Sequence, residues 1–140
     1  MNDATKILEM IEAVDPVDTD MLDEIDARVC AFLKFHDGFK VSFAGGSIYY
    51  RHNSWEPESR TQLLHLFDNF QYTRSRDALK EVRPVGWFFQ LVPCANGKWM
   101  CDSNYYEPFK AIHVHPLPTE ELAELHAIIQ AIQYERDQND

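Results

Sequence analysis

Residues 72–91 read YTRSRDALKEVRPVGWFFQL and pass from a helix to a strand within a short length of chain. Thr73 or Ser75 can cap the helix, since a hydroxyl at that position accepts a hydrogen bond from a free backbone N–H. Pro84 ends the helix because its ring disfavours helical geometry in the residue before it. A valine-glycine pair then turns the chain, and the apolar and aromatic residues 87–92 follow as a strand. This stretch predicts a fold that mixes helices with strands.

Longer helices are predicted on both sides of this stretch. The spacing of apolar residues indicates a short helix over 2–14 and a longer one over 18–36, which Asp37-Gly38 ends. The longer helix has three candidate caps: Asp18, Thr19 and Asp20. A C-terminal helix starts after Thr119, with acids in its first turn. Its apolar face has five members: Leu122, Leu125, Ile128, Ile129 and Ile132.

Five short strands are predicted: 39–43, 48–51, 87–92, 99–102 and 109–114. Gly45-Gly46 and Asn96-Gly97 supply the turns of two hairpins, and the Asn-Gly pair favours a type I′ turn. Residues 53–70 are predicted to be irregular with one short helix, and residues 104–108 to be a loop. We therefore expect an α+β fold, with an antiparallel sheet of about five strands covered by the N- and C-terminal helices in an α/β/α-type sandwich.

The 140 residues are expected to form one globular domain over 1–140, with a short N-terminal helical arm at 1–17 and a polar tail at 136–140. The chain carries 13 basic and 23 acidic residues, a net charge of −10. Such a chain lacks the excess of cations that neutralises nucleic-acid phosphates. Direct binding to nucleic acid is therefore not expected.

The three cysteines are expected to be free thiols in a reducing compartment. No apolar run approaches the eighteen residues of a membrane span, and no apolar segment follows Met1. We therefore expect a cytoplasmic protein that does not bind a membrane.

The sequence HVH at residues 113–115 is the best local candidate for metal binding. Alternate residues of a strand point to the same side, which would place the imidazoles of His113 and His115 on one face. Two ligands do not complete a site, and no third ligand has a fixed spacing from them. The chain also lacks a nucleophile elbow and a phosphate-binding loop. We therefore predict no catalytic residue, no metal and no cofactor.

Acidic residues gather at the N-terminal end of the chain. Residues 1–26 contain nine acids and one base, Lys6. The simplest interpretation is a solvated helix face, because acids are favourable near a helix N-terminus. The alternative is a partner-binding surface with five candidate residues: Asp15, Asp18, Asp20, Asp23 and Glu24.

The aromatic strand at Trp87-Phe88-Phe89 offers apolar side chains to both faces of its sheet. Such a strand needs either helices on both sides or a partner chain on one side. The sequence thus leaves open a covered sheet and a homodimer joined through an aromatic face.

Three stretches resemble the phage ABA sandwich domain found in small proteins of phages and prophages. They are LDEIDARV at 22–29, YTRSRDAL at 72–79 running on through VRPVGWFFQL, and PTEELAELHAIIQAI at 118–132. The family offers no established activity to transfer. The resemblance implies a phage or prophage accessory protein in the bacterial host cytoplasm, acting as a non-enzymatic module that binds a host or phage protein. The alternatives are a small metal- or carboxylate-dependent enzyme and an acidic DNA mimic that inhibits a host protein.

Overall fold

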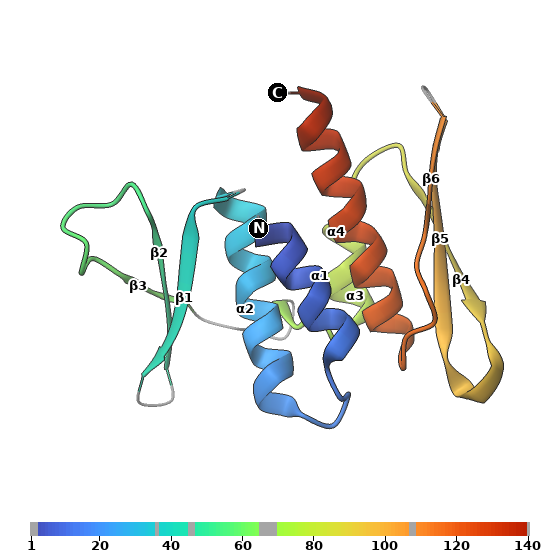
Figure 1. Ribbon diagram of the computed structural model, residues 1–140, viewed down its shortest axis with the longest axis horizontal. Coiled ribbons are helices and arrows are strands. Elements are labelled where there is room, and N and C mark those ends of the chain that lie inside the picture. The colour runs from blue at the N-terminus through green and yellow to red at the C-terminus, as the bar shows by residue number, and fades with distance from the viewer. Residues whose placement is uncertain (1–2, 36, 45–46, 65–69, 107–108, 140) are drawn as a thin grey trace.

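A computed structural model describes most of the chain in three layers, with helices in the middle and a small sheet on each side (Figure 1). The described residues are 3–35, 37–44, 47–64, 70–106 and 109–139. Their helices are α1 (Asp3–Ala13), α2 (Thr19–Phe35), α3 (Arg76–Lys80) and α4 (Glu120–Asn139). Their strands are β1 (Phe39–Ala44), β2 (Ser47–His52), β3 (Gln62–Leu64), β4 (Phe88–Pro93), β5 (Trp99–Tyr106) and β6 (Phe109–His113).

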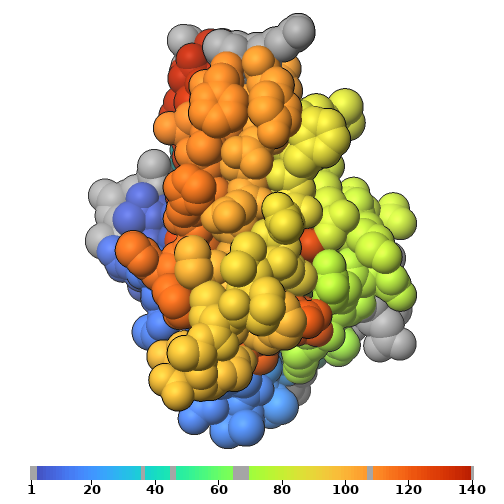
Figure 2. All heavy atoms as spheres, turned by 90° about the vertical axis from the view of Figure 1, so that its right-hand side faces the viewer, coloured from blue at the N-terminus to red at the C-terminus, as the bar shows by residue number. Residues whose placement is uncertain are grey.

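The strands form two antiparallel sheets rather than one. The first has the order β1-β2-β3 and the second the order β4-β5-β6. The second sheet covers one end of the molecule, and Figure 2 shows its outer side. The α+β class is thus confirmed, whereas the single sheet of about five strands is wrong. Each predicted hairpin pairs within itself and adds one further strand, and the two hairpins pack on opposite sides of the helices.

The expected α/β/α order of layers is also wrong, because the helices lie between the sheets. Residues 122–129 of α4 are all buried, over more than two turns. A helix that covers one face of a sheet keeps a solvated side, whereas a helix buried all round needs neighbours on every side. α4 contacts β5 on one side and α1 on the other, and α2 in turn contacts β1. Ile7 and Ile11 of α1 are buried in the same core.

Several local predictions are confirmed. Ser75 caps α3, accepting a 3.2 Å hydrogen bond from the Ala78 N–H. Thr119 caps α4 through a 3.2 Å bond from the Leu122 N–H. The Asn-Gly pair turns as expected, because Asn96 and Gly97 both have positive φ and Lys98 N donates to Ala95 O at 3.4 Å. Hydroxyl caps and Asn-Gly turns act on backbone groups a few residues away, so they form whatever the tertiary arrangement is.

Other boundaries differ from the prediction. The predicted loop at 104–108 is strand as far as Tyr106, because β5 is the central strand and pairs with both neighbours. Within 53–70, residues 62–64 form β3; 65–69 lie outside the described residues, as does the predicted turn at Gly45-Gly46. Residues 136–139, predicted as tail, continue α4.

The turn between α3 and β4 depends on Gly86. Gly86 has φ +90°, and a Cβ added there would lie 2.7 Å from Cε2 of Tyr105. The close approach lets Trp87, the next residue, lie buried against Tyr105 and Tyr134. Its indole N–H donates a 2.7 Å hydrogen bond to Glu135 of α4. The turn thus attaches the second sheet to the helical layer.

Gly86→Ala should lower the free energy of unfolding more than Gly97→Ala does. Both positions have positive φ, which costs an L-residue roughly 1–2 kcal/mol. A Cβ at Gly97 meets nothing within 4 Å. At Gly86 it meets Tyr105, and overpacking adds roughly 1–3 kcal/mol. Urea unfolding followed by circular dichroism measures both variants, and equal losses would contradict the role assigned to Tyr105.

Candidate functional site

The first half of α2 and the far end of the β1–β2 hairpin border an open groove of about 620 Å³. We call it the acidic groove, and its lining is Asp18, Asp20, Met21, Asp23, Glu24, Phe43 and Ile48. A second hollow of about 430 Å³ adjoins it, because Asp18, Met21 and Glu24 line both. Asp15 and Lys6 line this second hollow. The five candidate partner-binding acids therefore lie around one continuous surface.

Two of these acids help to form the start of α2. Asp18 accepts a 3.2 Å hydrogen bond from the Met21 N–H, as an N-cap does. Asp15 accepts a 3.0 Å bond from the Val17 N–H in the turn before the helix. The helix dipole favours negative charge here. The fold thus holds these acids in place without cancelling their charge.

Two other acids have cationic partners. Arg74 contacts Asp23 at 2.5 Å, and Arg28 contacts Glu24 at 3.1 Å. In the described part of the chain, Asp20 has no ion-pair partner. The negative charge available to a ligand therefore comes mainly from Asp15, Asp18 and Asp20, with Lys6 at the edge of the adjoining hollow.

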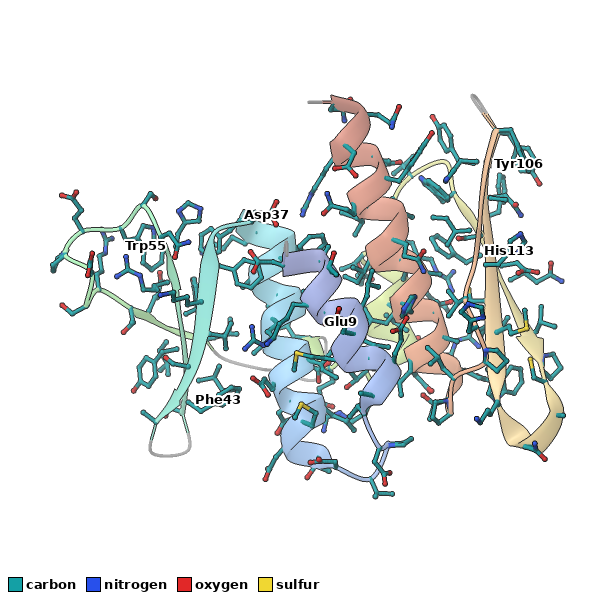
Figure 3. The ribbon with its side chains drawn as sticks, viewed as in Figure 1. Glu9, Asp37, Phe43, Trp55, Tyr106 and His113 are labelled. Atoms are coloured by element: carbon teal, nitrogen blue, oxygen red, sulfur yellow. The ribbon has the colours of Figure 1, made fainter. Side chains whose placement is uncertain are left out.

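The other wall of the groove is apolar. Phe43 of β1 is 49% exposed, and its backbone pairs with that of Ile48 in β2. Figure 3 shows Phe43 at the end of the hairpin, beside the first turns of α2. Sequence reasoning missed Phe43, Ile48 and Met21 as site residues. Met21 lies on α2 among the acids, whereas nothing local signals that the hairpin end lies beside the start of α2, so only the tertiary structure brings Phe43 and Ile48 to them.

Arg74 links the groove to a buried carboxylate. Asp26 is fully buried and accepts hydrogen bonds from the Thr73 N–H at 2.9 Å, the Thr73 hydroxyl at 3.2 Å and Arg74 at 2.7 Å. Burial raises the pKa of Asp26 from 3.8 to about 6, although the hydrogen bonds from Arg74 and Thr73 lower it. Arg74 therefore joins a half-buried acid of the groove, Asp23, to the fully buried Asp26.

The metal candidates do not form a complete site. His113 Nδ1 lies 2.7 Å from Asp102 Oδ1 on the exposed side of the second sheet (Figure 3). β6 ends at His113, but burial still alternates beyond it, because Val114 is buried and both His113 and His115 are exposed. Within the described ranges, no three histidine, cysteine, aspartate or glutamate side chains gather closely enough to hold a metal ion.

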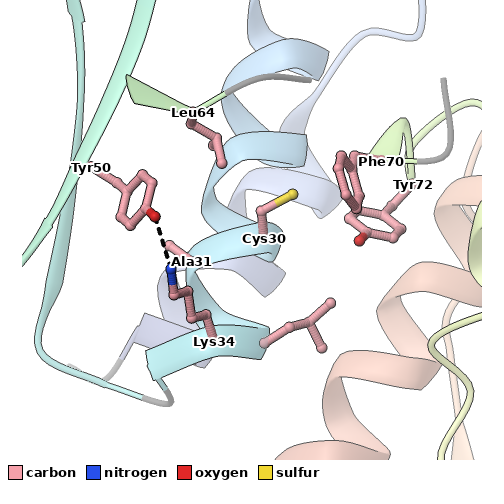
Figure 4. Close-up of a pocket in the computed structure, with 8 residues that line it drawn as sticks. Cys30, Ala31, Lys34, Tyr50, Leu64, Phe70 and Tyr72 are labelled. Atoms are coloured by element: carbon pink, nitrogen blue, oxygen red, sulfur yellow. Dashed lines mark hydrogen bonds between the residues drawn. The ribbon is translucent and has the colours of Figure 1, made fainter. Parts of the chain in front are cut away.

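An apolar pocket of about 350 Å³ lies along the second half of α2, between the helix and Tyr50 and Leu64 of the first sheet (Figure 4). Lys34 donates a 2.9 Å hydrogen bond to the Tyr50 hydroxyl at its edge. Burial raises the pKa of the Cys30 thiol to about 12, so this cysteine is protonated at neutral pH. A protonated thiol is a poor nucleophile, and the pocket walls offer packing surface rather than reactive groups.

Comparison with known proteins gives no relative: no family model matches the chain, and neither a curated protein nor a solved structure matches it. Among the helices of the described ranges, none has the length and apolar character to cross a membrane. The site therefore has to be interpreted from its own geometry.

Asp26 should make stability fall as pH rises through a defined window. Its pKa is about 6 in the folded protein and ordinarily 3.8, so between these values the folded state holds a proton that the unfolded state has lost. The stabilising contribution is complete below about pH 4 and is lost as pH rises through 6. Since one pKa unit corresponds to about 1.4 kcal/mol, the total is on the order of 3 kcal/mol.

Denaturant unfolding from pH 4 to 7 measures this effect as the difference between the protein and its Asp26→Asn variant. That difference should fall as pH rises. Asp77→Asn, at an exposed position, should follow the unchanged protein at every pH. A flat difference curve for Asp26→Asn would show that Asp26 titrates as an ordinary carboxylate.

Proposed function

We propose that this chain is a non-enzymatic binding module whose acidic groove holds a basic, partly apolar segment of a partner protein. The observation that carries the proposal is the meeting of carboxylates from the start of α2 with the half-exposed Phe43 across one groove. Acids alone are common on helix starts, and single exposed apolar residues are common on surfaces. Their combination in a hollow favours a ligand with both features.

The chemistry of the groove suggests an amphipathic partner. Phe43 and Ile48 of the hairpin, together with Met21 of α2, offer apolar surface that an aliphatic or aromatic side chain can cover. Asp18 and Asp20 lie on the helix side of the groove, where lysine or arginine side chains of the same segment can pair with them. An amphipathic helix that lays an apolar face in a groove is a recurring mode of peptide recognition.

The biological setting is part of the proposal. The resemblance of residues 22–29, 72–91 and 118–132 to phage ABA sandwich proteins supports a phage or prophage accessory protein. We propose that it acts in the bacterial host cytoplasm on a host or phage protein. The net charge of −10 supports the same kind of partner, because it draws cationic surfaces and repels nucleic acid.

A labelled model peptide tests the groove directly. The probe is a fluorescein-labelled amphipathic helix of leucine and lysine, compared with the same peptide carrying glutamate for lysine. Fluorescence anisotropy should show binding of the lysine peptide alone. The binding should weaken as salt rises from about 50 to 500 mM, because exposed charges are screened.

Two variants of the groove and two matched controls make the test specific. Asp20→Lys and Phe43→Ala should each weaken binding of the lysine peptide roughly tenfold, by reversing a charge and by removing the apolar contact. The controls Asp77→Lys and Val85→Ala alter an exposed acid and an exposed apolar residue elsewhere, and should change nothing. Equal effects of all four, or equal binding of both peptides, would refute the proposed site.

A further inference from the structure

The second sheet has one face against the helices and one face toward solvent. Its inner face packs on α4 through side chains such as Leu91, Cys101 and Ile112. Strand residues alternate between faces, so their neighbours point away from the helices. We call the solvent side the outer face, and within the described ranges no helix or strand lies over it (Figures 1 and 2).

Three aromatic side chains gather at one end of the outer face. Phe88 of β4 is 63% exposed, Tyr106 of β5 is 58% exposed and Phe109 of β6 is 65% exposed. Tyr106 lies in the middle, with ring centroids 5.8 Å from Phe88 and 5.7 Å from Phe109. We call these residues the aromatic cluster. A contiguous exposed group of this kind marks an interaction surface, unlike single scattered apolar residues.

A polar row crosses the same face beside the cluster. Gln90, Asp102 and His113 are register partners across β4, β5 and β6, and Asp102 bonds to His113 at 2.7 Å. An apolar centre bordered by polar groups is the usual composition of a protein interface. The carboxylate of Asp102 already has a hydrogen-bond partner within the row, since it bonds to His113.

The outer face differs in charge from the acidic groove, so the two surfaces suit different partners. The chain has a net charge of −10, but the outer face offers only the paired Asp102 and His113 along with uncharged side chains. A basic partner gains little here. Among the described residues, the one acid that a second copy brings to this face is Asp102, which is already hydrogen-bonded to His113.

The area of the cluster is large enough to matter for a dimer. A buried aromatic side chain covers roughly 150–250 Å². Three of them, each about three-fifths exposed, leave roughly 300–450 Å² in contact with water, close to half of the ~800 Å² that each partner contributes to a standard interface. The polar row and the rest of the sheet face supply the remainder.

We propose that two copies of this chain form a symmetric dimer by packing their outer faces together, aromatic cluster against aromatic cluster. The interface is isologous, since the same patch serves both copies. A two-fold axis parallel to β5 places β4 of one copy over β6 of the other, as in aligned sheet packing. Phe88 then meets Phe109, and Tyr106 meets Tyr106. The proposal is independent of the acidic groove.

Sedimentation velocity over a concentration series tests the proposal on the full chain. The protein should pass from its monomer mass of 16.4 kDa to twice that mass as concentration rises. Raising salt from about 50 to 500 mM should strengthen the dimer, because screening reduces the repulsion between two acidic copies and leaves apolar contact intact. The acidic groove predicts the opposite dependence for its cationic peptide, so the two proposals can fail separately.

The double variant Phe88→Ser/Phe109→Ser should weaken the dimer at least tenfold and leave the lysine-peptide binding unchanged. Phe43→Ala should have the reverse effect. All three side chains are largely exposed, and circular dichroism checks that each variant is folded. Tyr106→Glu is a second variant that keeps both phenylalanines and places like charges opposite each other, so it should also weaken the dimer. A monomer at every concentration and salt, or a dimer that these substitutions do not weaken, would overturn the proposal.

Discussion

The burial of residues 122–129 of α4 on all sides is the constraint on which the rest of the structure depends. A helical segment that presents no face to water requires packing partners in every direction, and those partners are α1, the β4–β6 sheet and the segment around α3. Its polar residues fix each of them in turn. Buried Glu124 pairs with Arg83 and Arg76, His126 lies 2.9 Å from Glu12 of α1, and Glu135 accepts from the Trp87 indole. These contacts lower the free-energy cost of burying the three side chains, although among the described side chains of α4 Glu124 Oε2 and Gln133 Oε1 are buried without a hydrogen-bond partner.

The sequence predicts those parts of the fold that have local causes. Hydroxyl caps at Ser75 and Thr119 and the turn at Asn96-Gly97 each act through neighbouring backbone groups, and the structure has all of them. The pairing of hairpins into sheets and the order of layers have no such local cause. The leucines and isoleucines at 122–132 predict one apolar face of α4, whereas Glu124 and His126 are buried as well. An ionisable residue buried by a distant partner does not look different in sequence from one that faces water.

The candidate site likewise has a part that follows from local sequence and a part that depends on tertiary packing. Asp15, Asp18, Asp20, Asp23 and Glu24 are close in sequence and share the start of one helix, so their proximity in space follows from helical geometry. Phe43 and Ile48 come from a hairpin that lies beside α2 only through tertiary packing. Arg74 is equally unforeseen, because its partners Asp23 and Asp26 lie far from it in the chain. The aromatic character of residues 87–89 did indicate a sheet that carries apolar side chains on both faces. It did not indicate that Trp87 faces the helices while Phe88 faces water.

The order of layers determines that the two binding surfaces can be used at the same time. Because the helices separate the sheets, the β1–β2 hairpin and the β4–β6 sheet lie at opposite ends of the long axis of the molecule (Figure 1). Contact at one end leaves the other accessible. Two chains joined at the β4–β6 end would carry their grooves at the far ends, pointing apart. A partner with two suitably spaced basic segments would then be held by both, and its second contact would form at the high effective concentration that tethering provides.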